Sequence, residues 1–496
     1  MIQTPVVSKP VLICVTMKKL FLFLWVSVFL IASVPTSHAA IKGYETWMGT
    51  YFHGKKLGFT HLKLKVRAKE TVINMRVYFR MVSEGVDQST TFTQETHLTP
   101  DLKLKHFTLV QELMGHRQKI EAEAKNGKLE LQVTSSDFKK KDSISFPPGM
   151  ALSSTYLLNM IRSGLSVGKK GKISVFVEPF QMVTGLAYYI LRQEKAELDG
   201  KQVEAYVVKQ NMSGMESTFW VTEDGIVLRE ESPQGFKSIR EPESVATDLG
   251  DEVFSASRFI TLSLIKLQRE IEKPRKLKKF KFKMSGMNSP GLIPTDHRQK
   301  VLTTKKLPSG AYISTVEIGS ELPSTEKAVQ VPVLVKASDR DRLLGASVEV
   351  QVKHPQIRAL SRLLAEGETD SWRLARIINR WVYDNMEKAL VDTVTAVDAL
   401  RERRGECQSH TYLFTALARA AGIPTKVVNG LVYSEDYGGF LYHAWPEVFV
   451  GQWRALDPTL GQDSVDATHI KLTENEREDP LKLMEFVGRV GIEIVE

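Results

Sequence analysis

The hydrophobic periodicity of this 496-residue chain changes at about Pro355. Before that point, apolar and polar residues alternate in short runs, such as Phe59 to Val66 and Val72 to Phe79. A period of two is typical of half-buried strands. Asn-Gly and Asp-Gly pairs follow such runs at Asn126 and Asp199, where hairpin turns would lie. After the change the apolar spacing becomes helical. We therefore expect an α+β protein whose C-terminal core is preceded by antiparallel β-rich domains.

The length of the chain predicts two to four domains, because one ordinary hydrophobic core does not reach this size. Between Phe254 and Glu272, the residues Ile260, Leu264 and Leu267 fall on one apolar stripe, which predicts a helix. The expected organisation is a β-rich domain over 40–250, a helical linker over 251–275, a small β domain over 276–352 and a last domain over 353–496.

The N-terminus has the pattern of a secretory signal peptide, which we place at residues 1–39. Met17-Lys18-Lys19 precedes an apolar run from Leu20 to Val34, and small residues follow up to Ala40. We favour Met17 over Met1 as the translation start. With either start, Cys14 falls outside the mature chain. The protein is thus expected to be exported, and the two-lysine start is typical of bacteria, so we expect the periplasm or cell envelope.

The net charge of +9 has a local component. Lys279, Lys281 and Lys283 alternate with Phe280 and Phe282, which predicts a half-buried strand with a basic outer face. The favoured interpretation is an edge strand that lysines protect from aggregation. The alternative is attraction to an anionic envelope surface. Nucleic-acid binding has no other support in the sequence, and export argues against it.

Cys407 is then the only cysteine of the mature chain, and it cannot form an intramolecular disulfide. Leu413, Ala416 and Leu417 continue an apolar helical stripe after it, and Gly422 is placed to end that helix. Cys407 would lie in the first turn. There the helix dipole and the unbonded N–H groups lower the pKa of a thiol and can hold an oxyanion. The alternative is a buried, inert cysteine.

His443 and Asp457 are the candidate partners of this thiol. They lie on two predicted strands, 442–450 and 453–457, around Gly451. A two-residue loop would place their side chains on opposite faces of the hairpin. A three-residue loop centred on Gly451 places Asp457 opposite Trp445 and diagonally beside His443, within reach of it. We predict the three-residue loop.

The chemistry assigns each group a role. His443 would take the thiol proton and later protonate a leaving amine. Asp457 would fix the tautomer and orientation of the imidazole. A zinc site at Cys407, His410 and His469 is not favoured, because a fourth convergent ligand is missing. The other candidates are interpreted as structural: a core or helix-surface His410, core aromatics at Trp445 and Trp453, and a solvated turn residue at Glu406.

Four ordered blocks over about residues 355–475 resemble the transglutaminase-like superfamily. They are Gly405-Glu406-Cys407, the helix end Leu417 to Pro424, His443-Ala444-Trp445 and Asp457-Pro458-Thr459. The resemblance implies a papain-like α+β core with a Cys–His–Asp triad at Cys407, His443 and Asp457.

A further segment, Asp466-Ala467-Thr468-His469-Ile470, is similar to exported bacterial members of that superfamily. Two segments depart from the family pattern. Gln408-Ser409 stands where many relatives have Asn-Glu, and Ala389-Leu390-Val391 stands where many carry an aromatic residue. These departures leave the substrate groove and the second oxyanion donor open.

The sequence therefore favours an exported thiol enzyme that performs acyl transfer or hydrolysis at amide bonds of protein or peptide substrates, with hydrolysis slightly preferred. The alternative is a non-catalytic envelope protein that binds peptide or glycan on the same scaffold. The proposed chemistry requires no metal or organic cofactor, although calcium dependence is known among relatives.

Overall fold

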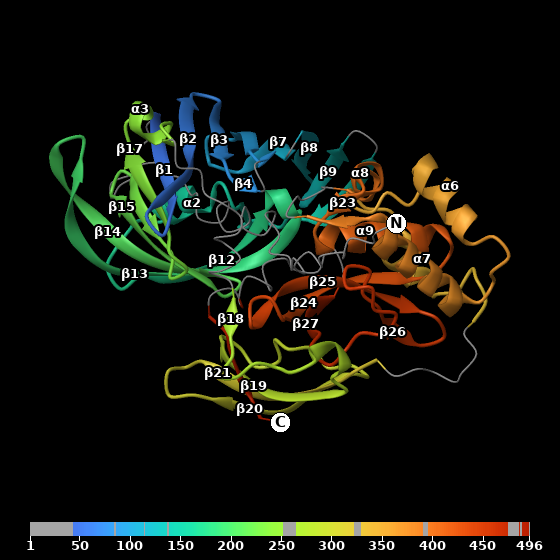
Figure 1. The fold of residues 1–496 in the computed structure, drawn as a ribbon. Coiled ribbons are helices and arrows are strands. Elements are labelled where there is room, and N and C mark those ends of the chain that lie inside the picture. The colour runs from blue at the N-terminus through green and yellow to red at the C-terminus, as the bar shows by residue number, and fades with distance from the viewer. Residues whose placement is uncertain are drawn as a thin grey trace. The chain divides into compact units, whose positions relative to one another are not determined.

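The computed structural model describes residues 43–83, 86–113, 115–135, 138–250, 264–321, 329–389, 395–474, 486 and 489–495. The described chain divides into two compact units, one within residues 43–250 and one from residue 264 onward (Figure 1). The predicted signal peptide lies outside the described residues. Within the described ranges, no helix is both long and apolar enough to span a membrane.

The first unit is built on one large sheet, which confirms the strand character predicted for residues 44–239. Its strands are β1 (Tyr44–Phe52), β2 (Lys55–Arg67), β3 (Glu70–Phe79), β6 (Thr90–Leu98), β7 (Leu104–Leu113), β8 (His116–Lys125), β9 (Lys128–Thr134), β10 (Lys139–Ser145), β11 (Ala151–Leu152), β12 (Lys170–Val177), β13 (Met182–Leu198), β14 (Lys201–Met212), β15 (Met215–Thr222), β16 (Val227–Glu231) and β17 (Phe236–Glu241). A separate short ribbon is formed by β4 (Val82–Ser83) and β5 (Val86–Asp87).

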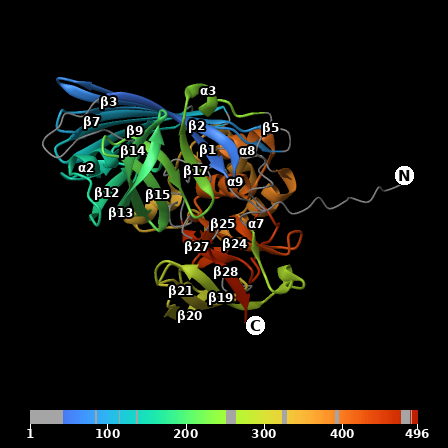
Figure 2. The same cartoon turned by 90° about the vertical axis from the view of Figure 1, so that its left-hand side faces the viewer.

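The sheet consists of two meanders joined side by side. One runs from β1 to β10 and the other from β12 to β17, and β1 pairs with β17 to join them. At the join, Gly49 lies opposite Ile239 in antiparallel register. Almost every connection is a hairpin between neighbours, so the alternating sequence pattern is enough to specify this topology. Figure 2 shows the sheet of this unit curving around α2 (Tyr156–Arg162).

The two meanders are also tied together by buried polar contacts at α2. Tyr156 at the start of α2 donates to Gln210 of β14. Just before α2, Ser153 and Ser154 donate backbone and hydroxyl groups to the buried carboxylate of Glu178, in the 3-10 turn η1 (Glu178–Phe180). Gln94 of β6 donates to the same carboxylate over 3.0 Å. The contact between Gln94 and Glu178 thus links the two meanders, and the others fix α2 and the segment before it to the second meander. A short helix, α3 (Glu243–Ala246), follows β17.

The second unit contains helices and two main sheets. Its helices are α5 (Ala337–Leu344), α6 (Pro355–Leu364), α7 (Ser371–Asn385), α8 (Ala396–Glu402) and α9 (Cys407–Ala420). One sheet has the order β18 (Ile265–Lys266), β25 (Gly439–Phe449), β24 (Thr425–Ser434), β27 (Ile470–Glu474), with β26 (Trp453–Ala455) also paired to β25. The other has the order β20 (Gln299–Lys306), β21 (Tyr312–Gly319), β19 (Lys279–Met287), β28 (Gly491–Ile494). A short parallel pair is formed by β22 (Glu387–Lys388) and β23 (Arg404–Gly405), and η2 (Pro274–Lys276) precedes β19.

Helix α9 is the centre of this unit, and almost all of its residues are buried. Leu413 and Leu417 pack with Leu374 and Ile378 of α7 and with Val448 of β25. The predicted apolar stripe of α9 thus faces the core, and the remaining sides of the helix are buried as well. The helix ends as expected, because Gly422 has a φ of +82°.

The other helices of the C-terminal part follow their sequence signals. The apolar spacing after Thr369-Asp370 predicts a helix over 371–385, and α7 occupies that range, with Asp370 accepting from the Arg373 amide over 2.8 Å as its cap. The sequence also predicts helices over 356–365 and 395–403, and α6 and α8 lie within one residue of these bounds.

The helix predicted for residues 254–272 is wrong over its described part. Ile265 and Lys266 form β18, which adds to the edge of β25 opposite Phe440 and Gly439. The backbone hydrogen bonds to β25, a strand distant in sequence, stabilise the extended conformation more than the local apolar spacing favours a helix. Residues 254–263 lie outside the described ranges. The segment predicted as entirely β, up to residue 352, also contains a helix, α5.

The basic strand is β19, and the interpretation of it as an edge strand is wrong. It lies between β21 and β28, and β28 comes from the far end of the chain. Lys279 and Lys283 form ion pairs with Glu317 and Glu493 on those neighbours, at 2.9 and 3.0 Å. These pairs lower the net charge of the strand face. Attraction of Lys279, Lys281 and Lys283 to an anionic envelope surface stays a prediction.

Candidate active site

Cys407 is the first residue of α9, as predicted. Glu406 precedes it with an extended backbone and serves as the N-cap residue. The cysteine is fully buried and packs against Ala444 of β25. Four residues further along α9, Thr411 donates to the carbonyl of Ala444 over 3.0 Å, which fixes the helix start against the strand. The thiol therefore lies where the positive end of the helix dipole and the first amide groups act on it.

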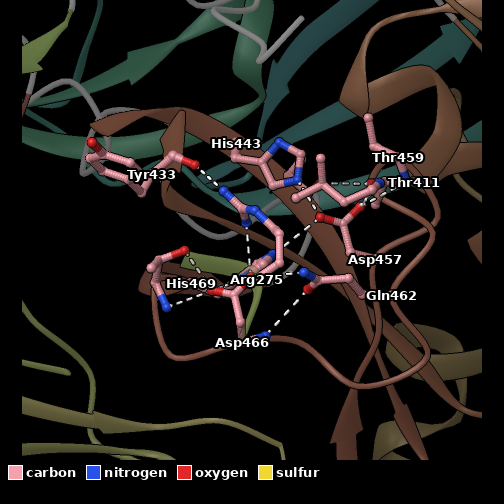
Figure 3. Close-up of polar contacts among 12 residues, drawn as sticks. Arg275, Thr411, Tyr433, His443, Asp457, Thr459, Gln462, Asp466 and His469 are labelled. Carbon is pink, nitrogen blue, oxygen red and sulfur yellow. Dashed lines mark hydrogen bonds and ion pairs between the residues drawn. The ribbon is translucent and has the colours of Figure 1, made fainter. Parts of the chain in front are cut away.

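The hairpin that carries the other two residues has the predicted register. Phe449 pairs with Trp453, and Glu447 pairs with Ala455, so the loop is the three residues 450–452. Strand β26 ends at Ala455, and Asp457 continues into a bridge with Gln462. His443 Nε2 lies 2.8 Å from Asp457 Oδ2 (Figure 3). The odd loop length is the reason that both side chains lie on one face.

The electrostatics of His443 are set by two neighbours. Burial alone would lower the pKa of this imidazole, but the Asp457 carboxylate and the Cys407 sulfur outweigh that desolvation and raise the pKa of His443 to about 10. Cys407 is thus close enough to His443 for direct interaction. Because Nε2 faces Asp457, Nδ1 is the ring nitrogen left for the thiol. The arrangement favours a thiolate beside an imidazolium.

Asp457 is held as an anion inside the protein. Its Oδ1 accepts from the backbone amides of Thr459 and Leu460, at 2.7 and 3.0 Å. Its Oδ2 accepts from His443 and also from His469, whose Nε2 lies at 3.1 Å. Burial would raise the pKa of Asp457, but the two histidines outweigh it and hold that pKa well below its usual range.

A model of the transglutaminase-like superfamily matches residues 358–458, which include all three of these residues. The C-terminal part of this chain carries a transglutaminase-like domain.

Two curated relatives match this domain. Kyphoscoliosis peptidase of Mus musculus is 29% identical over 149 residues, which are 27% of this chain and 22% of the mouse protein. Its counterpart in Homo sapiens is 29% identical over 141 residues, or 25% of this chain and 21% of the human protein. The chain therefore spans about a fifth of the length of these relatives.

Two solved structures also resemble the chain. A candidate cysteine protease of Cytophaga hutchinsonii is 18% identical and covers 43% of this chain and 85% of its own, with a TM-score of 0.32. A candidate protease of Parabacteroides distasonis is 12% identical and covers 69% and 64%, with a TM-score of 0.20. At these TM-scores, neither likeness bears on the chemistry of the transglutaminase-like domain.

His469 is a neighbour of Asp457 that the sequence does not predict. The sequence places it in the Asp466-to-Ile470 segment and in an unfavoured zinc set with Cys407 and His410, whereas in the transglutaminase-like domain its Nε2 lies 3.1 Å from Asp457 Oδ2. The Asp466-x-x-His469 spacing was a visible signal, but its target lies across a loop whose path the sequence does not reveal.

One potential ligand atom from each of His443, Asp457 and His469 lies within 4.8 Å of the other two, a spacing that metal sites also show. Both Nε2 atoms are at hydrogen-bond distance from the carboxylate, so hydrogen bonds account for this cluster.

A second group of acids has a similar spacing and consists of Asp296, Glu447 and Glu474. These three acids surround the ammonium of Lys471, and each contact is 3.0 Å or shorter. Lys471 already supplies the cation there.

His410, Trp445 and Glu406 are all buried in the transglutaminase-like domain. His410 is a core residue: burial lowers its pKa to about 4, and its Nδ1 lies 2.8 Å from the Glu406 carbonyl. Trp445 is fully buried, as expected of a core aromatic. Glu406 is not a solvated turn residue, since only 4% of it is exposed. Glu406 is buried because it directly precedes α9, a helix that is itself buried.

Proposed function

We propose that the transglutaminase-like domain is a thiol enzyme that acts on amide bonds of protein or peptide substrates through an acyl-enzyme, on a papain-like core. The observation that carries the proposal is the 2.8 Å contact between His443 and Asp457, with His443 beside Cys407 at the start of α9. The sequence resemblance, which contributed the same three residues, supports the assignment independently of these contacts.

The first half of the reaction forms the acyl-enzyme. The Cys407 thiol gives its proton to His443 Nδ1, and the thiolate sulfur attacks the amide carbonyl carbon. A C–S bond forms and the carbonyl π electrons move to oxygen. Amide groups at the start of α9 can stabilise that oxyanion. His443 then protonates the amide nitrogen, the C–N bond breaks and the amine leaves.

The second half releases the acyl group. Water or an amine gives a proton to His443 and attacks the thioester carbonyl, and the thiolate leaves. Asp457 stays ionised throughout and keeps the His443 ring in one orientation. Water as acceptor gives hydrolysis, and an amine gives crosslinking. We favour hydrolysis, because water is abundant and the sequence indicates no amine-binding site.

The second candidate function is a non-catalytic envelope protein that uses the same domain to bind peptide or glycan. The presence of all three residues at one place, with His443 bound to Asp457 and beside Cys407, argues against it, since binding alone does not require them. We also propose that the protein is exported to the periplasm or cell envelope, on the basis of its N-terminal sequence.

Mass spectrometry of an envelope extract distinguishes the two functions. The extract is treated with the natural protein or with the Cys407→Ala variant. Cleaved or isopeptide-linked peptides that form only with the natural protein support the enzyme and identify the acceptor. Identical product profiles from both proteins would favour the binding role.

A further inference from the structure

Asp457 accepts hydrogen bonds from two imidazole rings with a single oxygen atom. His443 and His469 approach Oδ2 at 2.8 and 3.1 Å, and both rings are almost fully buried. A carboxylate can only accept, so His469 Nε2 carries the proton of its hydrogen bond. The proposed reaction has no direct use for this second ring, which binds the carboxylate beside His443, with the two ring centroids 5.9 Å apart (Figure 3).

A second acid, Asp466, lies close to Nδ1 of the His469 ring without a hydrogen bond to it. This Nδ1 lies 3.5 Å from Asp466 Oδ1. Arg275 and Gln462 donate to the other oxygen of Asp466, each over 2.8 Å. Burial would raise the pKa of Asp466, but His469 and Arg275 outweigh it and hold that pKa well below its usual range. The Asp466 carboxylate is thus a fixed anion that faces the back of the His469 ring.

Two further contacts restrict the whole assembly. Gln462 exchanges a pair of backbone hydrogen bonds with Asp457, at 2.8 and 2.9 Å, so one residue connects both acids. The Trp445 ring lies edge-on to His469, with centroids 5.2 Å apart, and stacks with His443 at 6.1 Å. The two imidazoles therefore have little freedom to rotate.

We infer that His469 is a positioning residue of the proposed thiol enzyme: its hydrogen bond to Asp457 Oδ2 keeps that oxygen directed at His443, and Asp466, fixed by Arg275, faces Nδ1 of the His469 ring. The inference rests on the proposed function. With Oδ1 bound to two backbone amides and Oδ2 bound between two rings, the carboxylate has one orientation only. Loss of the His469 donor would leave Oδ2 free to turn away from His443, although every residue that touches the reacting atoms is still present.

Three substitutions separate this role from simple packing. His469→Gln can place an amide nitrogen near the position of Nε2 and keep the donor to Asp457. His469→Asn can place one near Nδ1, on the Asp466 side. His469→Phe keeps the ring and removes both nitrogens. We expect Phe and Asn to lower kcat roughly 10- to 100-fold with KM within about twofold, and Gln to restore most of kcat.

The assay is incorporation of a labelled primary amine into casein, together with release of peptides from casein, and urea unfolding shows which variants are folded. Alkylation of Cys407 by iodoacetamide across pH needs no substrate and is measured alongside. We expect the Phe and Asn variants to need a higher pH for alkylation than the natural protein and Gln to match it.

The outcomes separate this inference from the proposed function. If the natural protein shows neither products nor thiolate reactivity below the pH of an ordinary thiol, the function and the inference both fail. If the natural protein is active and a folded Phe variant matches it in kcat and alkylation, only the role of His469 fails. Should Phe not fold, equal losses in Gln and Asn would overturn the inference.

Discussion

His443 Nε2 and Asp457 Oδ2 lie 2.8 Å apart because the hairpin between their strands turns through three residues. With a loop one residue shorter, the two side chains would lie on opposite faces of the hairpin and could not make contact. On its other side the imidazole faces Cys407, the first residue of helix α9. The start of a helix and the two arms of a hairpin thus meet at one buried ring.

Asp457→Asn should reduce the turnover of amide substrates by roughly 10²–10⁴-fold, because a neutral amide neither stabilises the imidazolium nor enforces the same tautomer of His443. The measurement is kcat in the casein assay. Asp463→Asn is the matched control, since Asp463 lies in the same loop but pairs with Arg376 and Asn379. Equal effects of the two substitutions would show that the loop, and not the Asp457 charge, matters.

Acyl-enzyme formation should fall as the pH rises through about 10. The pKa of His443 is raised to about 10, so above this pH the ring loses the proton that it gives to the leaving amine. The matched comparison is iodoacetamide alkylation of Cys407, which needs the thiolate but no proton donor and should not fall over the same range. A parallel fall of both rates would indicate unfolding instead of loss of the general acid.

Gly430→Ala should destabilise the transglutaminase-like domain, at the upper end of the roughly 1–3 kcal/mol typical of overpacked cores. Gly430 lies opposite His443 in the sheet. A Cβ there would overlap the carbonyl oxygen of Ile470 and come within 2.7 Å of the Trp445 ring. Gly185→Ala in β13 is the control, because nothing lies within 4 Å of its Cβ position. Urea unfolding measures both, and a loss as small as that at Gly185 would contradict the packing.

Glu230→Gln should change the pH dependence of stability. Burial raises the pKa of Glu230 from 4.5 to about 8. Between these values the folded protein keeps a proton that the unfolded chain releases. The natural protein therefore loses stability as the pH rises from about 4.5 to about 8, by up to roughly 1.4 kcal/mol per pH unit, and no further above that range.

The glutamine variant has no such group, so the free energy of unfolding of the natural protein should drop relative to it between pH 5 and pH 8. Glu223→Gln, at an exposed position on the preceding turn, should show no such trend. A constant difference between the natural protein and Glu230→Gln at every pH would exclude a raised pKa at Glu230.

Local signals were sufficient for much of this structure. The alternating runs predicted the strands of the first unit, Asp370 marked the start of α7, and the parity of the Gly451 loop predicted the contact between His443 and Asp457. Each depends on residues close together in the chain. That is why sequence pattern and hydrogen-bond geometry could specify them.

Features that depend on distant partners were not predicted. Ile265 and Lys266 form a strand only because the edge of β25 is available to them, and their own spacing suggests a helix. His469 binds Asp457 because the loop between them folds back through Gln462. β19 is a central strand because β28, which is far from it in the sequence, pairs with its second edge. No local pattern carries this information.

The pH dependence of Cys407 alkylation by iodoacetamide tests the central claim most directly. The account predicts that the sulfur reacts as a thiolate well below pH 8.5, the pKa of an unperturbed thiol, and that His443→Ala moves the reactivity upward in pH. An apparent pKa of 8.5 or above in the natural protein, unchanged by His443→Ala, would contradict an activated cysteine at this site.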